Sequence, residues 1–345
     1  MGITERMQSR TPMLMEAALG ERLKSEYHLV PDEQVALVGI LYQPGGREAL
    51  KRLWQEYIDI AAAHHLPILL TTPTRRVNRE RAEHFPHRDT VIADHVALLR
   101  ELQGQASGEV YIGGLMGCRG DAYTGKGCLS TEESLEFHCW QAEQFRNSPV
   151  DFLMAGILPT LPEAMGLAQA MSETRFPYLI SFTIQPNGCL IDGTPISGAI
   201  ETIDQFVSRP PLGYMTNCVH PSILAQALAQ PCNQTAAVRE RFLGIQAKHG
   251  GGQLRKPGTG RQPEAHWPQG AGTRDDASAE EVRSLAVRRM LRHRWALSGG
   301  YGAGAGRKAL KTQKSGRSLG TTALLRCEKC VHTVLRSGSE PELLP

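Results

Sequence analysis

The feature that most constrains the fold is a regular alternation of short apolar segments with segments of helical periodicity. Residues 67–72 form an apolar run of the length of a buried strand, and residues 45–64 carry apolar side chains at helical spacing. Six or seven such units can be counted before residue 247. Strands that alternate with helices predict a parallel sheet, either a closed (β/α)8 barrel or a doubly wound open sheet. The glycines after residue 113 do not form a G-x-G-x-x-G fingerprint, so a nucleotide-binding open sheet has little support.

Polar and thiol side chains directly follow several predicted strands. Glu16 and Thr72 end two of them, and Asn217-Cys218 ends a third. The C-terminal ends of barrel strands share one rim, where active sites assemble. We therefore predict that Glu16, Thr72 and Asn217 contact substrate and that Asn217 also orients the Cys218 loop. Cys218 is either a small buried residue or a zinc ligand, and its place at a strand end favours the ligand.

Charge divides the chain into two parts. Residues 248–345 hold 18 Lys and Arg against 8 Asp and Glu, a net charge of +10, although the whole chain carries only +3. The alternation of strands and helices also stops at about residue 247. We predict an N-terminal extension over residues 1–11, a (β/α) barrel over residues 12–247 and a basic, disordered tail over residues 248–345.

Cysteine usage and hydropathy indicate the compartment. The eight cysteines are scattered along the chain, no apolar run has the roughly 18 residues that a membrane helix needs, and no secretory pattern opens the sequence. Reduced thiols in the cytoplasm, without a membrane partner, are the expectation. Cys327 and Cys330 have the spacing of a metal or redox pair, but they lie in the tail without a second pair, so we interpret them as coincidental.

Several motifs, in order along the chain, resemble those of the homocysteine S-methyltransferase family. Residues 14–23 are similar to the family's opening LLDGAMGTEL, residues 71–80 to TTNTYQANRE, and residues 129–143 to LSEEELIDFHREQAE. The later matches are Pro159-Thr-Leu-Pro-Glu-Ala164, Ile180-Ser-Phe182, Leu190-Ile-Asp-Gly-Thr-Pro195 and Asn217-Cys218. Each motif alone has little specificity, but the ordered set over residues 12–247 is specific.

The resemblance implies a (β/α)8 barrel that transfers a methyl group to a thiol. In the family, three cysteine thiolates hold Zn²⁺, one from the Asn-Cys motif, which is Cys218 here, and two from a later Gly-Gly-Cys-Cys. The substrate thiol takes the open fourth position, where zinc lowers its pKa and makes it a nucleophile. The implied acceptor is homocysteine, the implied product is methionine, and the implied donor is S-methylmethionine or S-adenosylmethionine.

Two residues depart from the family pattern. Glu16-Ala17 replaces the opening Asp-Gly, and Gly156 stands where the family has a glutamate that contacts the amino-acid substrate. The missing carboxylate removes one partner for an ammonium group. The acceptor thiol therefore stays open on the sequence alone.

The chain contains no Gly-Gly-Cys-Cys, but its codons can hide one. Read one nucleotide out of phase, residues 288–295 can encode Gly-Gly-Cys-Cys-Gly-Thr-Asp-Gly. Methionine has one codon and every leucine codon begins with C or T, so the overlap of Met290 and Leu291 must read as cysteine. We infer that residues from about 248 onward are translated in a shifted frame. This predicts the loss of two zinc ligands and of the last one or two barrel units, an open sheet edge, and impaired activity.

Two other functions stay open at this point. A non-catalytic barrel that binds a small thiol or amino acid without a metal is compatible with Gly156. A basic tail could bind nucleic acid electrostatically, but it lacks interleaved aromatic residues and a fold signature, so we expect no nucleic-acid partner.

Overall fold

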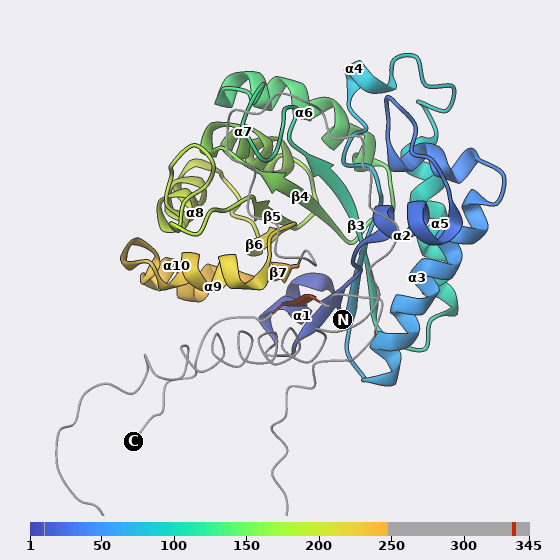
Figure 1. The fold of residues 1–345 in the computed structure, drawn as a ribbon, viewed down its shortest axis with the longest axis horizontal. Coiled ribbons are helices and arrows are strands. Elements are labelled where there is room, and N and C mark those ends of the chain that lie inside the picture. Colours follow the sequence, from blue (N-terminus) through green and yellow to red (C-terminus); the bar gives the residue numbers. More distant parts are fainter. Residues whose placement is uncertain (10, 248–332, 336–345) are drawn as a thin grey trace, which may run out of the picture. The chain divides into compact units, whose positions relative to one another are not determined.

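Seven parallel strands in the described chain pair in sequence order and form the wall of a barrel (Figure 1). The structure is a computed structural model that describes residues 1–9, 11–247 and 333–335. These residues all belong to one compact unit. The predicted (β/α) barrel is confirmed, and the open doubly wound sheet is excluded. The strands are β1 Met13–Met15, β2 Ile68–Thr71, β3 Val110–Gly117, β4 Phe152–Leu158, β5 Tyr178–Phe182, β6 Gly213–Asn217 and β7 Phe242–Gln246.

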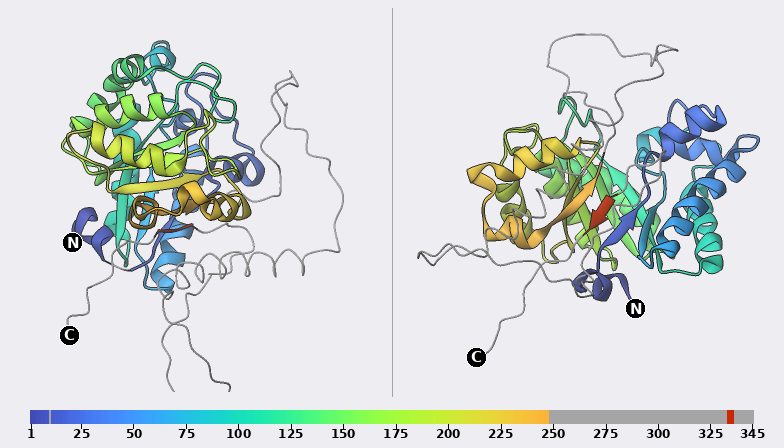
Figure 2. Two further views of the ribbon diagram at one scale, coloured as in Figure 1. Left: turned by 90° about the vertical axis from the view of Figure 1, so that its left-hand side faces the viewer. Right: turned by 60° about the horizontal axis from the view of Figure 1, so that its bottom comes forward.

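The eighth position of the barrel holds a short strand that runs against the others. β8, Thr333–Leu335, pairs antiparallel with β1 along three residues and meets β7 where Leu335 pairs with Gly244 (Figure 2). The barrel is thus incomplete as a (β/α)8 fold, because its eighth strand is not part of a parallel unit. The prediction of an open sheet edge is wrong at the positions where β8 pairs with β1 and β7. Residues 333–335 form a strand, which the prediction of a disordered tail did not include. The other residues of the predicted tail lie outside the described residues.

Helices connect successive strands and cover the outside of the barrel (Figure 1). Most coincide with the segments of helical periodicity in the sequence. Residues 37–42, an apolar segment between α2 and α3, form a 3₁₀-helix. The helices are α1 Ile3–Gln8, α2 Leu19–Tyr27, η1 Leu37–Tyr42, α3 Gly46–Ala63, α4 Arg79–Ala82, α5 Val91–Gln105, α6 Thr131–Arg146, α7 Leu161–Ser172, α8 Ile196–Phe206, α9 Pro221–Ala229, η2 Pro231–Asn233 and α10 Ala236–Arg241.

Local sequence signals explain where several helices begin. Ser130 caps α6 by accepting a hydrogen bond from the Glu133 N–H, while the Glu133 carboxylate accepts one from the Ser130 N–H, the reciprocal pattern of a capping box. α9 begins with Pro221, whose missing N–H would have no helical partner in any case. Because β3 and β6 run in the same direction, the loops that precede α6 and α9 lie at the same end of the barrel.

Alternate strand residues fill the barrel interior, as the period of a strand requires. Each of the seven parallel strands contributes at least one buried side chain to a single cluster. Ile3 and Met7 of α1 join this cluster, so the predicted N-terminal extension is part of the core. The strand residues of the cluster are Met13, Met15, Leu69, Tyr111, Phe152, Met154, Leu179, Met215 and Leu243.

Within the described ranges, no helix combines the length and apolar character needed to cross a bilayer.

Candidate functional site at the C-terminal ends of the strands

The four predicted site residues follow parallel strands, at the C-terminal end of the barrel. Glu16 comes directly after β1, Thr72 after β2, and Cys218 after β6, whose last residue is Asn217. Gln246, the last residue of β7, joins two of these ends. Its backbone carbonyl accepts the Cys218 N–H at 3.0 Å, and its side-chain amide donates to the backbone carbonyl of Glu16 at 2.7 Å. Glu16 and Cys218 are therefore held at one rim by a shared neighbour.

Glu16 is a buried carboxyl group with one oxygen atom still available. Its Oε1 accepts hydrogen bonds from the Thr71 N–H at 3.0 Å and the Thr71 hydroxyl at 2.5 Å, whereas no protein group among the described residues bonds Oε2. Burial raises the pKa of Glu16 to about 7, although the bonds from Thr71 act in the opposite direction. The group can thus exchange a proton near neutral pH and can accept a hydrogen bond from a ligand.

Asn217 is buried, and its side chain connects three strands. Its Oδ1 accepts the Ile157 N–H of β4 at 2.9 Å and the Ser181 hydroxyl of β5 at 2.6 Å. Its Nδ2 donates toward the Cys218 sulfur, 3.8 Å away. This geometry supports the predicted role in orienting Cys218, and it leaves Oδ1 occupied by protein donors.

Cys218 occupies an unusual backbone conformation at the rim. Its φ of 60° lies in the left-handed region, which non-glycine residues rarely adopt. The Tyr123 hydroxyl forms a hydrogen bond with the Cys218 side chain, and burial together with this thiol raises the pKa of Tyr123. The bonds to the backbone and side chain of Cys218 fix the direction of its sulfur.

The Thr72 hydroxyl belongs to a closed network inside the protein. It accepts the Leu115 N–H at 3.1 Å and lies 2.7 Å from the Thr74 hydroxyl, which itself donates to the Leu115 carbonyl at 2.7 Å. Thr74 has used its own hydrogen, so the Thr72 hydroxyl is the donor between the two. The structure therefore places Thr72 in the contact between β2 and β3 with its hydroxyl fully engaged.

Gly156 lies beside Asn217, at an irregular point of β4. The β4–β5 register shifts between Ala155 and Leu158, and Ile157 has a φ of 51°. A Cβ atom on Gly156 would lie 3.1 Å from the Leu115 Cδ1 and 3.8 Å from the Asn217 Nδ2. The position at which the resemblance implies a glutamate thus faces the site, and here it carries no side chain.

Arg75 is a residue of this rim that the sequence analysis did not single out. It lies half-buried in the loop after β2, and its Cγ would be 2.4 Å from a Cβ atom on Gly117, the last residue of β3. Burial and the neighbouring Arg76 lower the pKa of Arg75, whereas Cys118, Cys218 and Tyr123 act against this lowering. The signal in the sequence was a charged residue at the place of the tyrosine in TTNTYQANRE.

Two further cysteines flank the rim but remain thiols. Burial, with the nearby Glu163 carboxylate, raises the pKa of Cys118 to about 12, and burial also raises the pKa of Cys128, which hydrogen-bonds Glu163. Glu163 itself lies 3.5 Å from the His138 Nε2. In the absence of a metal ion both side chains are therefore protonated at neutral pH.

The described residues do not fit a zinc ion. Cys218 is the one thiol at the predicted metal position, and over residues 1–9 and 11–247 no three His, Cys, Asp or Glu side chains gather to hold a metal. A structural or catalytic zinc site needs at least three protein ligands. Met290, Leu291, Cys327 and Cys330 lie outside the described residues.

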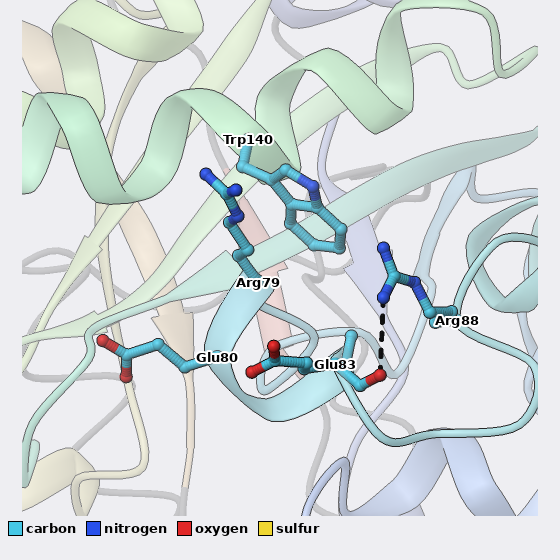
Figure 3. A pocket seen from close by; sticks show the side chains of 6 residues that line it. Arg79, Glu80, Glu83, Arg88 and Trp140 are labelled. Atoms are coloured by element: carbon cyan, nitrogen blue, oxygen red, sulfur yellow. Dashed lines mark hydrogen bonds between the residues drawn. The ribbon is translucent and has the colours of Figure 1, made fainter.

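A separate surface pocket of about 260 Å³ lies between α4 and α6, and none of the four predicted residues lines it (Figure 3). Trp140 of α6 and Arg79 lie beside each other in it, and Arg88 donates to the Glu83 carbonyl at 3.4 Å. The pocket carries both signs of charge, from two arginines and two glutamates, and so favours no particular ligand class.

The comparisons with known proteins agree with the geometry of the fold. A family model described as Homocysteine S-methyltransferase matches residues 13–300. Two crystal structures of the homocysteine methyltransferase MmuM from Escherichia coli are similar in fold. The metallated form has a TM-score of 0.56 at 18% identity and covers 66% of this chain and 81% of its own. The oxidised form has a TM-score of 0.54 at 19% identity, with 64% and 78% covered.

No sequence among the curated proteins matches this chain. The family match nevertheless spans most of the chain, including every strand from β1 to β7. The chain belongs to the homocysteine S-methyltransferase family.

Proposed function

We propose that the barrel binds a small thiol, such as homocysteine, at its C-terminal rim and that the protein transfers a methyl group to the thiol sulfur. The chain is a methyltransferase-like enzyme by family. The observation that carries the proposal is the placement of Cys218 and Glu16 on either side of Gln246, which concentrates a thiol and an available carboxyl oxygen at one rim. A small thiol with a second polar group could contact both.

The proposed reaction is a displacement at a methyl carbon. A bond forms between the acceptor sulfur and the methyl carbon while the carbon–sulfur bond of a sulfonium donor breaks. The donor, S-methylmethionine or S-adenosylmethionine, leaves as a neutral thioether, and the thiol proton passes to water. With homocysteine as acceptor the product is methionine. Glu16 holds the acceptor, Asn217 fixes the Cys218 loop, and Thr72 supports the wall between β2 and β3.

We propose that zinc binds to the protein made when the original reading frame is restored, called the restored protein below. Cys218 would be one of its three thiolate ligands. When bound, zinc would supply a lowered thiol pKa. The described residues do not complete such a site, so we propose that this chain, with residues 248–345 in the shifted frame, is impaired. The scattered cysteines support a cytoplasmic protein. Its partners in this proposal are the small-molecule thiol and the methyl donor, without nucleic acid or membrane.

Methyl transfer can be measured directly. The purified chain and its frame-restored counterpart are incubated with homocysteine and each donor in turn, and methionine is quantified by mass spectrometry. The proposal predicts methionine from the restored protein with at least one donor and much less from this chain. Absence of any methylated thiol from the restored protein, with both donors and with the fold intact by circular dichroism, contradicts it.

A non-catalytic barrel that binds a small thiol or amino acid is the second candidate. It is favoured by Gly156, which carries no side chain where the resemblance implies a substrate-binding glutamate. Zinc content separates the two candidates, because the binder predicts a restored protein that holds no zinc near neutral pH.

A further inference from the structure

The side chain of Arg75 lies against Gly117, the last residue of β3. Gly117 pairs with Gly156 in the β3–β4 register. A Cβ atom on Gly117 would lie 2.4 Å from the Arg75 Cγ and 3.3 Å from the Gly156 carbonyl oxygen. The aliphatic part of Arg75 therefore occupies space that any larger residue at 117 would fill. Since Gly156 also adjoins Asn217, the guanidinium belongs to the same rim as Cys218.

The guanidinium of Arg75 has no carboxylate partner among the described residues. Other arginines of the barrel do: Arg241 is paired with Asp204 at 2.8 Å, and Arg100 is paired with Asp151 at 3.0 Å. The groups that interact with Arg75 are the second cation Arg76 and the weakly acidic side chains Cys118, Cys218 and Tyr123. A half-buried cation loses hydration and is stabilised when an anion pairs with it.

Acidic groups near the rim are poorly suited to receive an ammonium group. Asp121 is committed to the backbone N–H groups of Tyr123 and Thr124, at 2.8 and 2.9 Å. Glu16 uses one oxygen for Thr71, and its raised pKa of about 7 leaves it only partly ionised at neutral pH. Gly156 offers no side chain. None of these acidic groups is an ion-pair partner of Arg75 in the described part of the chain.

We propose that Arg75 binds the carboxylate of the acceptor and that the acceptor is a mercapto acid without a neighbouring ammonium group. This inference rests on the proposed function, because it names the class of thiol that the same site would methylate. A guanidinium and a carboxylate form two parallel hydrogen bonds, which fixes the acceptor's orientation as well as its charge. Arg75, at the place of the tyrosine in the family motif, and Gly156, at the place of the glutamate, both shift the site toward anions.

Three thiols that differ by one charged group each test the preference. 4-Mercaptobutyrate is homocysteine without its ammonium group, and 3-aminopropane-1-thiol is homocysteine without its carboxylate. Their binding to the full chain is measured by isothermal titration calorimetry under reducing conditions. The inference predicts that 4-mercaptobutyrate binds about tenfold or more tightly than L-homocysteine, and that 3-aminopropane-1-thiol binds most weakly. Equal or tighter binding of homocysteine, or no binding of any of the three, overturns it.

Substitutions at the two adjacent arginines separate a specific contact from net charge. Arg75→Gln should weaken 4-mercaptobutyrate binding about tenfold or more, because it removes a charge-assisted pair. Arg76→Gln removes the same charge one residue away and should change it less than about threefold, the size of a screened surface effect. Arg75→Lys keeps the charge and should retain part of the affinity. Equal effects of Arg75→Gln and Arg76→Gln, with unchanged melting temperatures, overturn the assignment.

The failure of this inference can be told apart from the failure of the proposed function. If homocysteine binds best and is methylated, the methyltransferase proposal stands and the mercapto-acid inference is wrong. If 4-mercaptobutyrate binds with the predicted dependence on Arg75 but the restored protein methylates no thiol, the inference stands and the barrel is a binder.

Discussion

The Oδ1 of Asn217 accepts the backbone N–H of Ile157 at 2.9 Å, across the C-terminal ends of β6 and β4. Ile157 has a positive φ, at a point where β4 and β5 change register. A β-branched residue in this conformation is strained, and such strain persists only where surrounding contacts hold it. The shape of the rim beside Cys218 therefore depends on the hydrogen bond from Ile157 to Asn217.

Replacement of Asn217 by alanine should destabilise the fold by about 2–4 kcal/mol, because it leaves the buried Ile157 N–H and Ser181 hydroxyl without their acceptor. The free energy of unfolding in urea measures this. Asn187→Ala provides a matched control, since exposed Asn187 accepts one N–H from Cys189 in a loop, and it should cost less than about 1 kcal/mol. Similar losses for the two variants would contradict the role of Asn217.

Glu16 should make stability fall as the pH rises. Its pKa in the folded protein is about 7 against an ordinary value of 4.5, so between these values the folded state holds a proton that the unfolded state has lost. Stability linked to this group is fully present below about pH 4.5 and is lost as the pH rises through 7, by about 3 kcal/mol in total. Glu16→Gln should remove this slope.

Urea unfolding of the wild type and Glu16→Gln at several values between pH 5 and 8 compares the two slopes. Glu136→Gln, on the exposed face of α6, should follow the wild-type curve. Parallel curves for Glu16→Gln and the wild type would show that the Glu16 carboxyl is already ionised in the folded protein throughout this range.

The contact between α6 and α7 depends on a glycine. A Cβ atom on Gly166 would lie 2.3 Å from the Thr131 carbonyl oxygen and 2.6 Å from the Ser134 Cβ. Gly166→Ala should therefore destabilise the fold by about 1–3 kcal/mol through overpacking. Gly104→Ala, near the end of α5 with nothing within 4 Å, should be neutral or stabilising by about 0.5 kcal/mol. Thermal unfolding of the two variants gives the comparison, and a stable Gly166→Ala variant would contradict the close approach.

Much of the fold could be predicted because it depends on local patterns. The apolar runs of the strands and the apolar stripe of α3 can be recognised in the sequence alone, and the positions of Glu16 and Cys218 follow from the ends of strands. β8 could not be predicted in this way, since it pairs with strands more than 80 residues away in sequence. Tertiary contacts decide such pairings, and local propensity does not.

The residues at the strand ends could be predicted from the sequence, but the groups that their side chains contact could not. Thr72 and Asn217 lie where their strands place them, yet their hydroxyl and Oδ1 atoms are engaged by Leu115 and Ile157, which come from other strands. Arg75 is in a loop, where neither periodicity nor spacing indicates the direction of a side chain. The close approach of Arg75 to Gly117 is evident only from the three-dimensional structure, in which the loop lies beside β3.

We propose that Cys218 is one ligand of a zinc site whose other ligands are encoded in a shifted reading frame. Resequencing across codons 245–250 identifies the frame, and removal of the extra base restores it in an expression vector. The most direct measurement is the zinc content of the purified proteins by plasma mass spectrometry. We expect about one zinc per chain in the restored protein, the loss of this zinc in Cys218→Ser, and little zinc in the chain described here. A restored protein without zinc, or one that keeps its zinc in Cys218→Ser, would contradict it.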